Sequence, residues 1–405
     1  MPVFLWAQLS SYGQFSRGIT AFQQAAAQDT SDYREAYRIL QEEVHKAPDS
    51  ASLHYFLGYT IDRLNAEDGK TLYLADQQKT ILASEQFELV NRLEPTYKGP
   101  FVSLDPYSKI ASIWGSLAMR YWYNNQTDSV MWAFKEGKRR GGFREAVLDY
   151  CRNLLNSCDS SALLFTYGDN LSFSAWYLQQ VEQLRTDITV VDVNLIHASW
   201  YPKLLKRDGL LDIGFSAEQL DTLSYINWSS RLIQITHPTQ PGLSLKWVLK
   251  PIYMNQYLLS GDRVMLDIIR RNFFKRPVYF NRNSDSSYNL FLGDYLRNEG
   301  LVQHLQSKKV DRYKDALLPV KNLKRWAILP EMQEDFARSR DARMVVSGYR
   351  WALVDRIIDL TDRNHYNEAK VWASVIREKF PPERLPYTSD GEEAYIRELL
   401  ERLQK

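Results

Sequence analysis

Six residues that could bind or react with a ligand lie within or directly after two apolar runs of the chain. Both runs lie in LLFTYGDNLSFSAWYLQQVEQLRTDITVVDVNL, residues 163–195. The six candidates are Gly168, Asp169, Asn170, Asp192, Asn194 and His197. General acid–base catalysis needs a carboxylate within reach of a histidine, and Asp169 or Asp192 with His197 would supply that pair. Alternation along a strand would place Asp192 and Asn194 on one face, where the same polar groups could instead hydrogen-bond a glycan or a peptide.

Motifs for nucleophilic and phosphate chemistry are missing from the sequence. It contains no Gly-x-Ser-x-Gly elbow, no glycine-rich phosphate loop and no Gly-x-Gly-x-x-Gly fingerprint. The two cysteines and six histidines do not fall at the spacing of metal ligands. We therefore expect no metal, no cofactor and no catalytic residue, and a binding role is favoured over an enzymatic one.

The Gly168-Asp169-Asn170 turn also has a purely structural interpretation. The short side chains of Asp169 and Asn170 can accept free N–H groups at the start of a helix, and Ser172 could do the same. Four nearby aromatic residues would either stack on a sugar or fill the core: Trp176, Tyr177, Trp200 and Tyr201. The pattern favours a strand-end turn and helix cap first, a binding cleft second and a catalytic site last.

The elements that would position these residues form an α/β pattern. Runs of strand-forming residues at 161–169, 187–196 and 275–283 alternate with segments of helical periodicity. Such alternation is typical of a parallel sheet, whose carboxyl edge is the usual place for a ligand. Residues 230–238 and 243–251 are interpreted as further strands or as extended loops.

The N-terminal part of the chain has helical periodicity and resembles the tetratricopeptide repeat. That repeat places a small residue, an apolar residue, a proline and then Leu-Gly at fixed offsets. The offsets are met by Ala36, Leu40, Pro48, Leu57 and Gly58. A second set follows an insertion of roughly 13 residues relative to the repeat period. It consists of Ala83, Phe87, Val90 and Pro95. Helical hairpins of this kind predict a protein partner.

Composition bounds the remaining classes of function. The 405 residues are 44% hydrophobic and 25% charged, with a net charge of +2, which is typical of a globular chain. The densest basic cluster, KEGKRR at 135–140, is interpreted as a solvated helix end, so we expect no nucleic-acid partner. No run of 18 apolar residues is present, so we expect no transmembrane segment.

The N-terminus and the cysteines bear on the cellular compartment. MPVFLWAQ, residues 1–8, reads as the end of a truncated signal peptide, which predicts a periplasmic or otherwise extracytoplasmic protein. The alternative is an apolar segment that packs on the body of the protein. Cys151 and Cys158 are expected to be free, largely buried thiols, and they could pair only if a helix stops between them.

Several long stretches of the chain resemble the soluble C-terminal region of a bacterial family of multi-span membrane proteins related to protein O-mannosyltransferases. The stretches are WAFKEGKRRGGF (132–143), NSCDSSALLFTYGDNLSFSAWYLQQVEQLRTDITVVDVNLIHASWYPKLLK (156–206), LDIIRRNFFKRPVYF (266–280) and GDYLRNEGLVQHL (293–305). The resemblance implies an extracytoplasmic location. The family has a second acid after Gly-Asp-Asn, where this chain has Leu171. In the related transferases the catalytic acid lies in the membrane part, so this chain is expected not to transfer sugars by itself.

The sequence thus predicts an α/β protein in which a small, mostly parallel sheet is flanked by tetratricopeptide-like helical hairpins. The expected segments are a truncated signal peptide at 1–8, a helical domain at 9–156, an α/β domain at 157–325 and a helical segment at 326–405. The expected function is that of an exported, non-enzymatic binding or scaffolding protein of the cell envelope. The alternative is a carbohydrate-related enzyme, or an accessory subunit of an envelope glycosyltransferase, that uses the Gly168-Asp169-Asn170 cleft.

Overall fold

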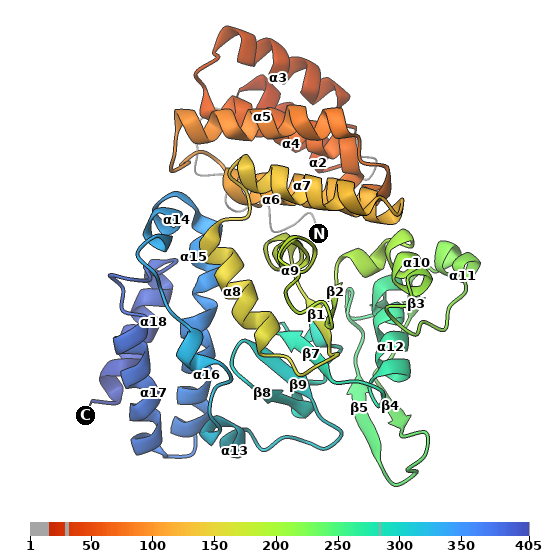
Figure 1. Ribbon diagram of the computed structural model, residues 1–405, viewed down its shortest axis with the longest axis vertical. Coiled ribbons are helices and arrows are strands. Elements are labelled where there is room, and N and C mark those ends of the chain that lie inside the picture. The colour runs from red at the N-terminus through yellow and green to blue at the C-terminus, as the bar shows by residue number, and fades with distance from the viewer. Residues whose placement is uncertain (1–15, 29–31, 283–284, 405) are drawn as a thin grey trace. The chain divides into compact units, whose positions relative to one another are not determined.

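The computed structural model describes residues 16–28, 32–282 and 285–404 (Figure 1). The predicted signal segment at 1–8 lies outside the described residues. The chain divides into two compact units. The first unit runs to Leu148 and includes Glu331–Arg343, and the second consists of Asp149–Pro330 with the chain from Met344 onward. The helical segment predicted from residue 326 is therefore shared between the two units.

The first unit is helical, and most of its helices form a stack (Figure 1). Its helices are α2 (Arg17–Ala26), α3 (Arg34–Lys46), α4 (Ala51–Ala66), α5 (Gln77–Leu93), α6 (Pro106–Tyr123), α7 (Thr127–Arg139) and α14 (Met332–Arg338), with short 3-10 turns η1 (Glu67–Gly69) and η2 (Leu72–Leu74). From α2 to α7 each helix packs against the next one in the sequence. Four of these helices begin at a Ser or Asp whose side chain accepts the N–H of the third residue that follows: Ser16, Ser50, Asp76 and Asp105. These caps satisfy donors that a helix cannot pair internally.

Glycines allow two of the helix pairs to approach closely. A Cβ on Gly58 of α4 would lie 2.8 Å from the ring of Phe87 in α5. A Cβ on Gly18 of α2 would lie 2.7 Å from the side chain of Leu40 in α3. Gly58, Phe87 and Leu40 are residues that the repeat spacing singled out, so two successive hairpins share one packing device. The assignment to the tetratricopeptide repeat itself stays a prediction.

The second unit contains the predicted sheet, which confirms the α/β fold class. Its five strands are β1 (Leu163–Thr166), β2 (Thr189–Asp192), β7 (Val278–Asn281), β8 (Leu296–Asn298) and β9 (Val302–Leu305). The strand order is β2-β1-β7-β9-β8 (Figure 1). β1 pairs in parallel with β2 and β7, and these are the three predicted strands. β8 and β9 were not predicted, and their antiparallel pairing makes the sheet mixed.

Helices and two small strand pairs complete the second unit. Its helices are α9 (Asp169–Val181), α10 (Trp200–Arg207), α11 (Ala217–Thr222), α12 (Ser260–Asn272), α13 (Arg312–Leu317), α16 (Gly348–Thr361), α17 (Tyr366–Lys379) and α18 (Asp390–Arg402). The strand pairs are β4 (Arg231–Thr236) with β5 (Ser244–Leu249), and β3 (Ile226–Asn227) with β6 (Tyr257–Leu258). Short 3-10 turns are η3 (Leu195–His197), η4 (Ser286–Asn289), η5 (Gly293–Tyr295) and η6 (Leu323–Arg325). The segments at 230–238 and 243–251 therefore form a hairpin. Two further helices are α8 (Glu145–Asn156) and α15 (Arg340–Val346). Among the described residues, no helix is both long and apolar enough to cross a membrane.

Candidate functional site

The Gly168-Asp169-Asn170 turn lies at the carboxyl end of β1, as the sequence predicted. Gly168 precedes α9 with φ of 89°, a backbone conformation that favours glycine. Asp169 and Asn170 are not caps, because both already belong to the first turn of α9 and no side chain caps that helix. The cap interpretation is wrong by one residue: the helix begins earlier than the polar pair suggested. A negative charge at Asp169 still suits the positive end of the helix dipole.

Asp192 is buried at the end of β2 and serves the local backbone. Its carboxylate accepts hydrogen bonds from the N–H groups of Asn194 and Leu195, at 2.8 and 2.9 Å. It also accepts one from the hydroxyl of Ser172 in α9, and that hydroxyl lies 2.8 Å from Thr166 Oγ1 in β1. Burial raises the pKa of Asp192 to about 6. The carboxylate therefore joins the ends of β1 and β2 to α9, and its hydrogen-bonding capacity is largely used.

Asn194 and His197 do not extend a face of β2. The strand ends at Asp192, and Asn194 has a helical backbone that starts η3, so the predicted alternation does not continue to it. The ring of His197 packs on α12, where a Cβ on Gly261 would lie 2.4 Å from it. Within the part of the chain that the structure describes, no hydrogen bond joins His197 to Asp169 or Asp192. The acid–base pair considered from the sequence is thus not assembled.

Aromatic side chains fill most of the sheet edge that was expected to hold a ligand. A cavity between the ends of β1 and β7 has a volume of about 10 Å³, enough for about one water. Its lining includes Tyr167 and Tyr288, whose ring centroids are 4.1 Å apart. The four aromatic residues proposed as stacking faces are all buried: Trp176, Tyr177, Trp200 and Tyr201. Their core interpretation is the one that the structure supports.

Two arginines from the stretches that carry the resemblance hold the sheet together. Arg276 donates to the carbonyls of Ser161 and Ala162 before β1, at 2.7 and 2.8 Å, and to Thr189 Oγ1 of β2 at 2.9 Å. Arg185 pairs with Asp187 and donates to carbonyl groups at the end of α8. These motif residues satisfy backbone acceptors, which gives them a structural role.

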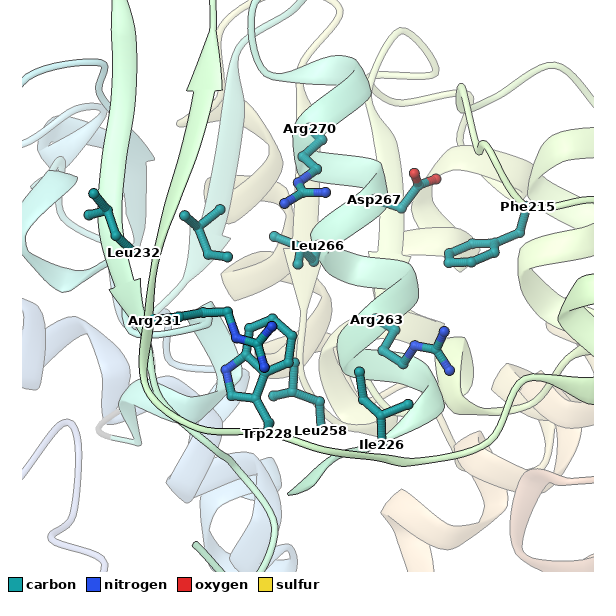
Figure 2. A pocket seen from close by; sticks show the side chains of 11 residues that line it. Phe215, Ile226, Trp228, Arg231, Leu232, Leu258, Arg263, Leu266, Asp267 and Arg270 are labelled. Carbon is teal, nitrogen blue, oxygen red and sulfur yellow. The ribbon is translucent and has the colours of Figure 1, made fainter. Parts of the chain in front are cut away.

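A larger cavity lies between β4 and α12, and none of the six candidate residues lines it. Its volume is about 460 Å³, within the range of small-molecule sites. The apolar part of its lining includes Trp228, Leu232, Leu258 and Leu266. The charged part of its lining consists of Arg231, Arg263, Arg270 and Asp267. In Figure 2, Arg231 and Arg270 reach toward the space between β4 and α12, while Arg263 and Asp267 lie nearer Phe215.

The charged side chains that line this cavity differ in the contacts they already make within the protein. The guanidinium of Arg231 lies 3.8 Å from the ring centroid of Trp228. Arg263 donates to the carbonyl of Ser224 at 2.9 Å. Among the described residues, Arg270 makes no hydrogen bond or ion pair. The sequence did not predict that Arg270, a cation without a partner among the described residues, lines a cavity large enough for a small ligand.

A weak signal for this cavity exists in the sequence. Arg263 and Arg270 are seven residues apart, with Leu266 and Asp267 between them, and this spacing places all four along one side of α12. The spacing does not reveal that β4 brings Arg231 and Trp228 to the same place, because that contact is tertiary.

A comparison with known protein families gives a match in the α/β region. Residues 147–210 and 234–317 match the family model described as TMEM260-associated domain 2. A comparison with curated proteins found no match. The unmatched residues 211–233 supply six of the eleven residues that line the larger cavity: Phe215, Ile226, Trp228, Arg231, Leu232 and Ile233. Residues 147–317 therefore carry a TMEM260-associated domain 2, within which residues 211–233 are unmatched.

Proposed function

We propose that this chain is a non-enzymatic binding protein of the cell envelope. In this proposal the second unit holds a small ligand in the cavity between β4 and α12, and the helical hairpins of the first unit bind a protein partner. The cavity carries the proposal: its volume of about 460 Å³ suits a ligand, whereas the cavity at the sheet edge measures about 10 Å³.

The state of the sheet-edge carboxylate supports binding rather than catalysis. Asp192 accepts hydrogen bonds from Ser172 and from two backbone N–H groups, so proton transfer to a substrate would disrupt local structure. His197 is not within hydrogen-bond distance of it. The alternative, a carbohydrate-related enzyme with Asp169 or Asp192 as its acid or base, has less support for this reason.

Exposed apolar side chains support a protein partner for the first unit. Leu82 and Leu93 of α5 are 37% and 39% exposed, and Trp132 of α7 is 41% exposed. Large apolar and aromatic side chains of this kind are buried at the cores of protein interfaces. The extracytoplasmic location rests on the resemblance to the soluble region of a membrane protein family.

Isothermal titration of the full chain tests where the ligand binds. The probes are maltotriose, trialanine and phenyl phosphate, which represent a glycan, a peptide and a small anion. Ile226 is half-buried in the cavity lining and pairs with Leu258, which also lines the cavity, so Ile226→Trp should narrow the cavity and weaken binding. Val248→Trp adds a tryptophan on an exposed residue of β5 outside the lining and should leave binding unchanged.

Asp169→Ala separates the two locations. We expect at least one probe to bind the wild-type chain, and Asp169→Ala to bind it equally well. Loss of binding in Asp169→Ala together with normal binding in Ile226→Trp would move the site back to the sheet edge. Absence of binding by all three probes would contradict the ligand-binding part of the proposal.

A further inference from the structure

We infer that the cavity between β4 and α12 is a site for an organic phosphate monoester, whether free in solution or as the headgroup of a lipid. This inference rests on the proposed function, and it adds the chemical class of the ligand. Three features lead to it: the charge of the cavity, the way in which its arginines are held, and the apolar surface beside them.

The cavity has an excess of positive charge. It is lined by the three guanidinium groups of Arg231, Arg263 and Arg270 and by one carboxylate, that of Asp267. Asp267 is already engaged, since it accepts hydrogen bonds from Arg271 Nε at 3.0 Å and from the N–H of Gly214 at 2.6 Å. The carboxylate therefore does little to neutralise the three cations that line the cavity.

This charge favours a dianion over the other small ligands. A phosphate monoester carries about −1.5 to −2 charges near pH 7, whereas a single carboxylate carries one and a neutral sugar none. Guanidinium groups form paired, charge-assisted hydrogen bonds with phosphate oxygens. A neutral glycan would leave all three cations without a counter-charge.

The arginines are arranged to receive such a group. Arg231 is held over Trp228 at 3.8 Å, so part of the cost of ordering its side chain is met before a ligand arrives. Arg270 makes no hydrogen bond or ion pair with any residue that the structure describes, and in Figure 2 it reaches toward the same space as Arg231. Arg263 is held by the carbonyl of Ser224 and adds charge from the other side of the cavity.

Apolar surface beside the arginines indicates an ester rather than inorganic phosphate. Ile233, Leu258 and Leu266 are buried side chains of the lining, and the half-buried Ile226 adds further apolar surface. A volume of about 460 Å³ accommodates a ring or a short chain in addition to the phosphate. The ligand should therefore be amphiphilic.

The cavity also belongs to this chain rather than to the matched domain as a whole. Trp228, Arg231 and Leu232 lie in residues 211–233, outside the match to the TMEM260-associated domain 2, whereas Arg263 and Arg270 lie inside it. The unmatched residues 211–233 thus contribute one wall of a cavity whose other wall, α12, lies in the matched region.

Titration of phenyl phosphate into the full chain tests the inference. We expect saturable binding that weakens about tenfold or more in Arg270→Gln and in Arg231→Gln, because each removes a charge-assisted contact. Arg325→Gln makes the same charge change on an exposed arginine outside the lining and should stay within about twofold of wild type. Unchanged thermal unfolding of the unliganded variants would show that they fold; Arg270 has no described partner whose loss would destabilise the protein.

Further binding measurements distinguish a phosphate in a lipid headgroup from a phosphate in a soluble ester. Sedimentation with vesicles of phosphatidic acid in phosphatidylcholine, against pure phosphatidylcholine vesicles, reports a lipid headgroup. Binding of phenyl phosphate without vesicle binding identifies a soluble ester, and vesicle binding that Arg270→Gln abolishes identifies a lipid. Either result supports the inference.

Three results would overturn it. The first is an absence of binding to both phenyl phosphate and phosphatidic acid. The second is an equal loss of binding in Arg325→Gln, which would reduce the effect to overall charge. The third is tight binding of maltotriose or trialanine that Ile226→Trp weakens but Arg270→Gln does not. In that case the cavity is a ligand site, as the proposed function holds, but not one for phosphate.

Discussion

The hydroxyl of Ser172, near the start of α9, donates a hydrogen bond to the carboxylate of Asp192 at the end of β2. The same carboxylate accepts two backbone N–H groups of the turn that follows. A residue that the sequence presented as a candidate acid or base is therefore a buried junction between a helix, a strand and a turn. Replacement of Asp192 should therefore change the stability of the protein and not a catalytic activity.

The first prediction concerns the pH dependence that Asp192 confers. Its pKa is raised from 3.8 to about 6, so the folded protein holds this proton more tightly than the unfolded chain does. The resulting stabilisation is fully present below pH 3.8 and is lost as the pH rises through 6. Asp192→Asn removes this titration. Between pH 4 and pH 7 its free energy of unfolding should fall by about 1–3 kcal/mol less than that of wild type.

Urea unfolding at pH 4, 5, 6 and 7 measures this difference. Asp262, Asp315 and Asp341 also have raised pKa values of about 6, so only the difference between variant and wild type isolates Asp192. Parallel pH profiles for the two proteins would contradict the assigned role.

A second prediction concerns a reciprocal pair in the first unit. The N–H of Asp105 donates to the carboxylate of Asp341 at 2.7 Å, and the N–H of Asp341 donates to the carboxylate of Asp105 at 2.9 Å. Both residues are buried. Asp341→Ala leaves the buried N–H of Asp105 without its acceptor, which should cost about 1–3 kcal/mol of stability.

Amide hydrogen exchange measures that loss at the start of α6. The amide of Asp105 should exchange faster in Asp341→Ala, whereas the exposed Asp49→Ala should leave it unchanged. Unaltered protection of that amide would show that the reciprocal pair does not hold residues 331–343 against α6.

A third prediction concerns the contact between α4 and α5. Gly58→Ala brings a methyl group to within 2.8 Å of the ring of Phe87, which is fully buried and has little room to shift. Overpacking of this kind costs about 1–3 kcal/mol. Thermal unfolding should report the loss, and Phe87→Leu in the Gly58→Ala background should recover part of it. Gly242→Ala is the control, since nothing lies within 4 Å of its added Cβ.

A fourth prediction concerns the two thiols. Cys151 and Cys158 are free and buried, and burial raises the pKa of both well above its usual range. The thiolate is the reactive form, so neither residue should react with Ellman's reagent in the native protein over a time in which both react in urea. Fast labelling under native conditions, or no labelling in urea without a reductant, would contradict this state.

Elements with strong local signals could be predicted from the sequence. The strands β1, β2 and β7 are short buried runs of mostly apolar residues, and α6 begins with Asp105 as its N-cap and Pro106 as its first residue. Local chemistry decides such features. β8 and β9 escaped prediction because they are short and are stabilised by pairing with β7 and with each other.

The candidate site was harder to predict, because its outcome depends on distant contacts. The position of Gly168 at a strand end was predicted, whereas Asp192 was expected inside a longer strand. The hydrogen bond that occupies Asp192 comes from Ser172, 20 residues earlier. The arginine-lined cavity is formed by residues of β4 and by residues of α12. The α12 residues follow those of β4 by about 36 positions in the sequence. No local pattern records that distance.

Hydrogen–deuterium exchange of the full chain, with and without phenyl phosphate, tests the central claim most directly: that the ligand site lies between β4 and α12 and not at the polar turn after β1. The account predicts that the ligand slows exchange in peptides that cover 226–236 and 260–272 and leaves those covering 166–173 and 194–198 unchanged. Protection confined to 166–173 and 194–198 would contradict it.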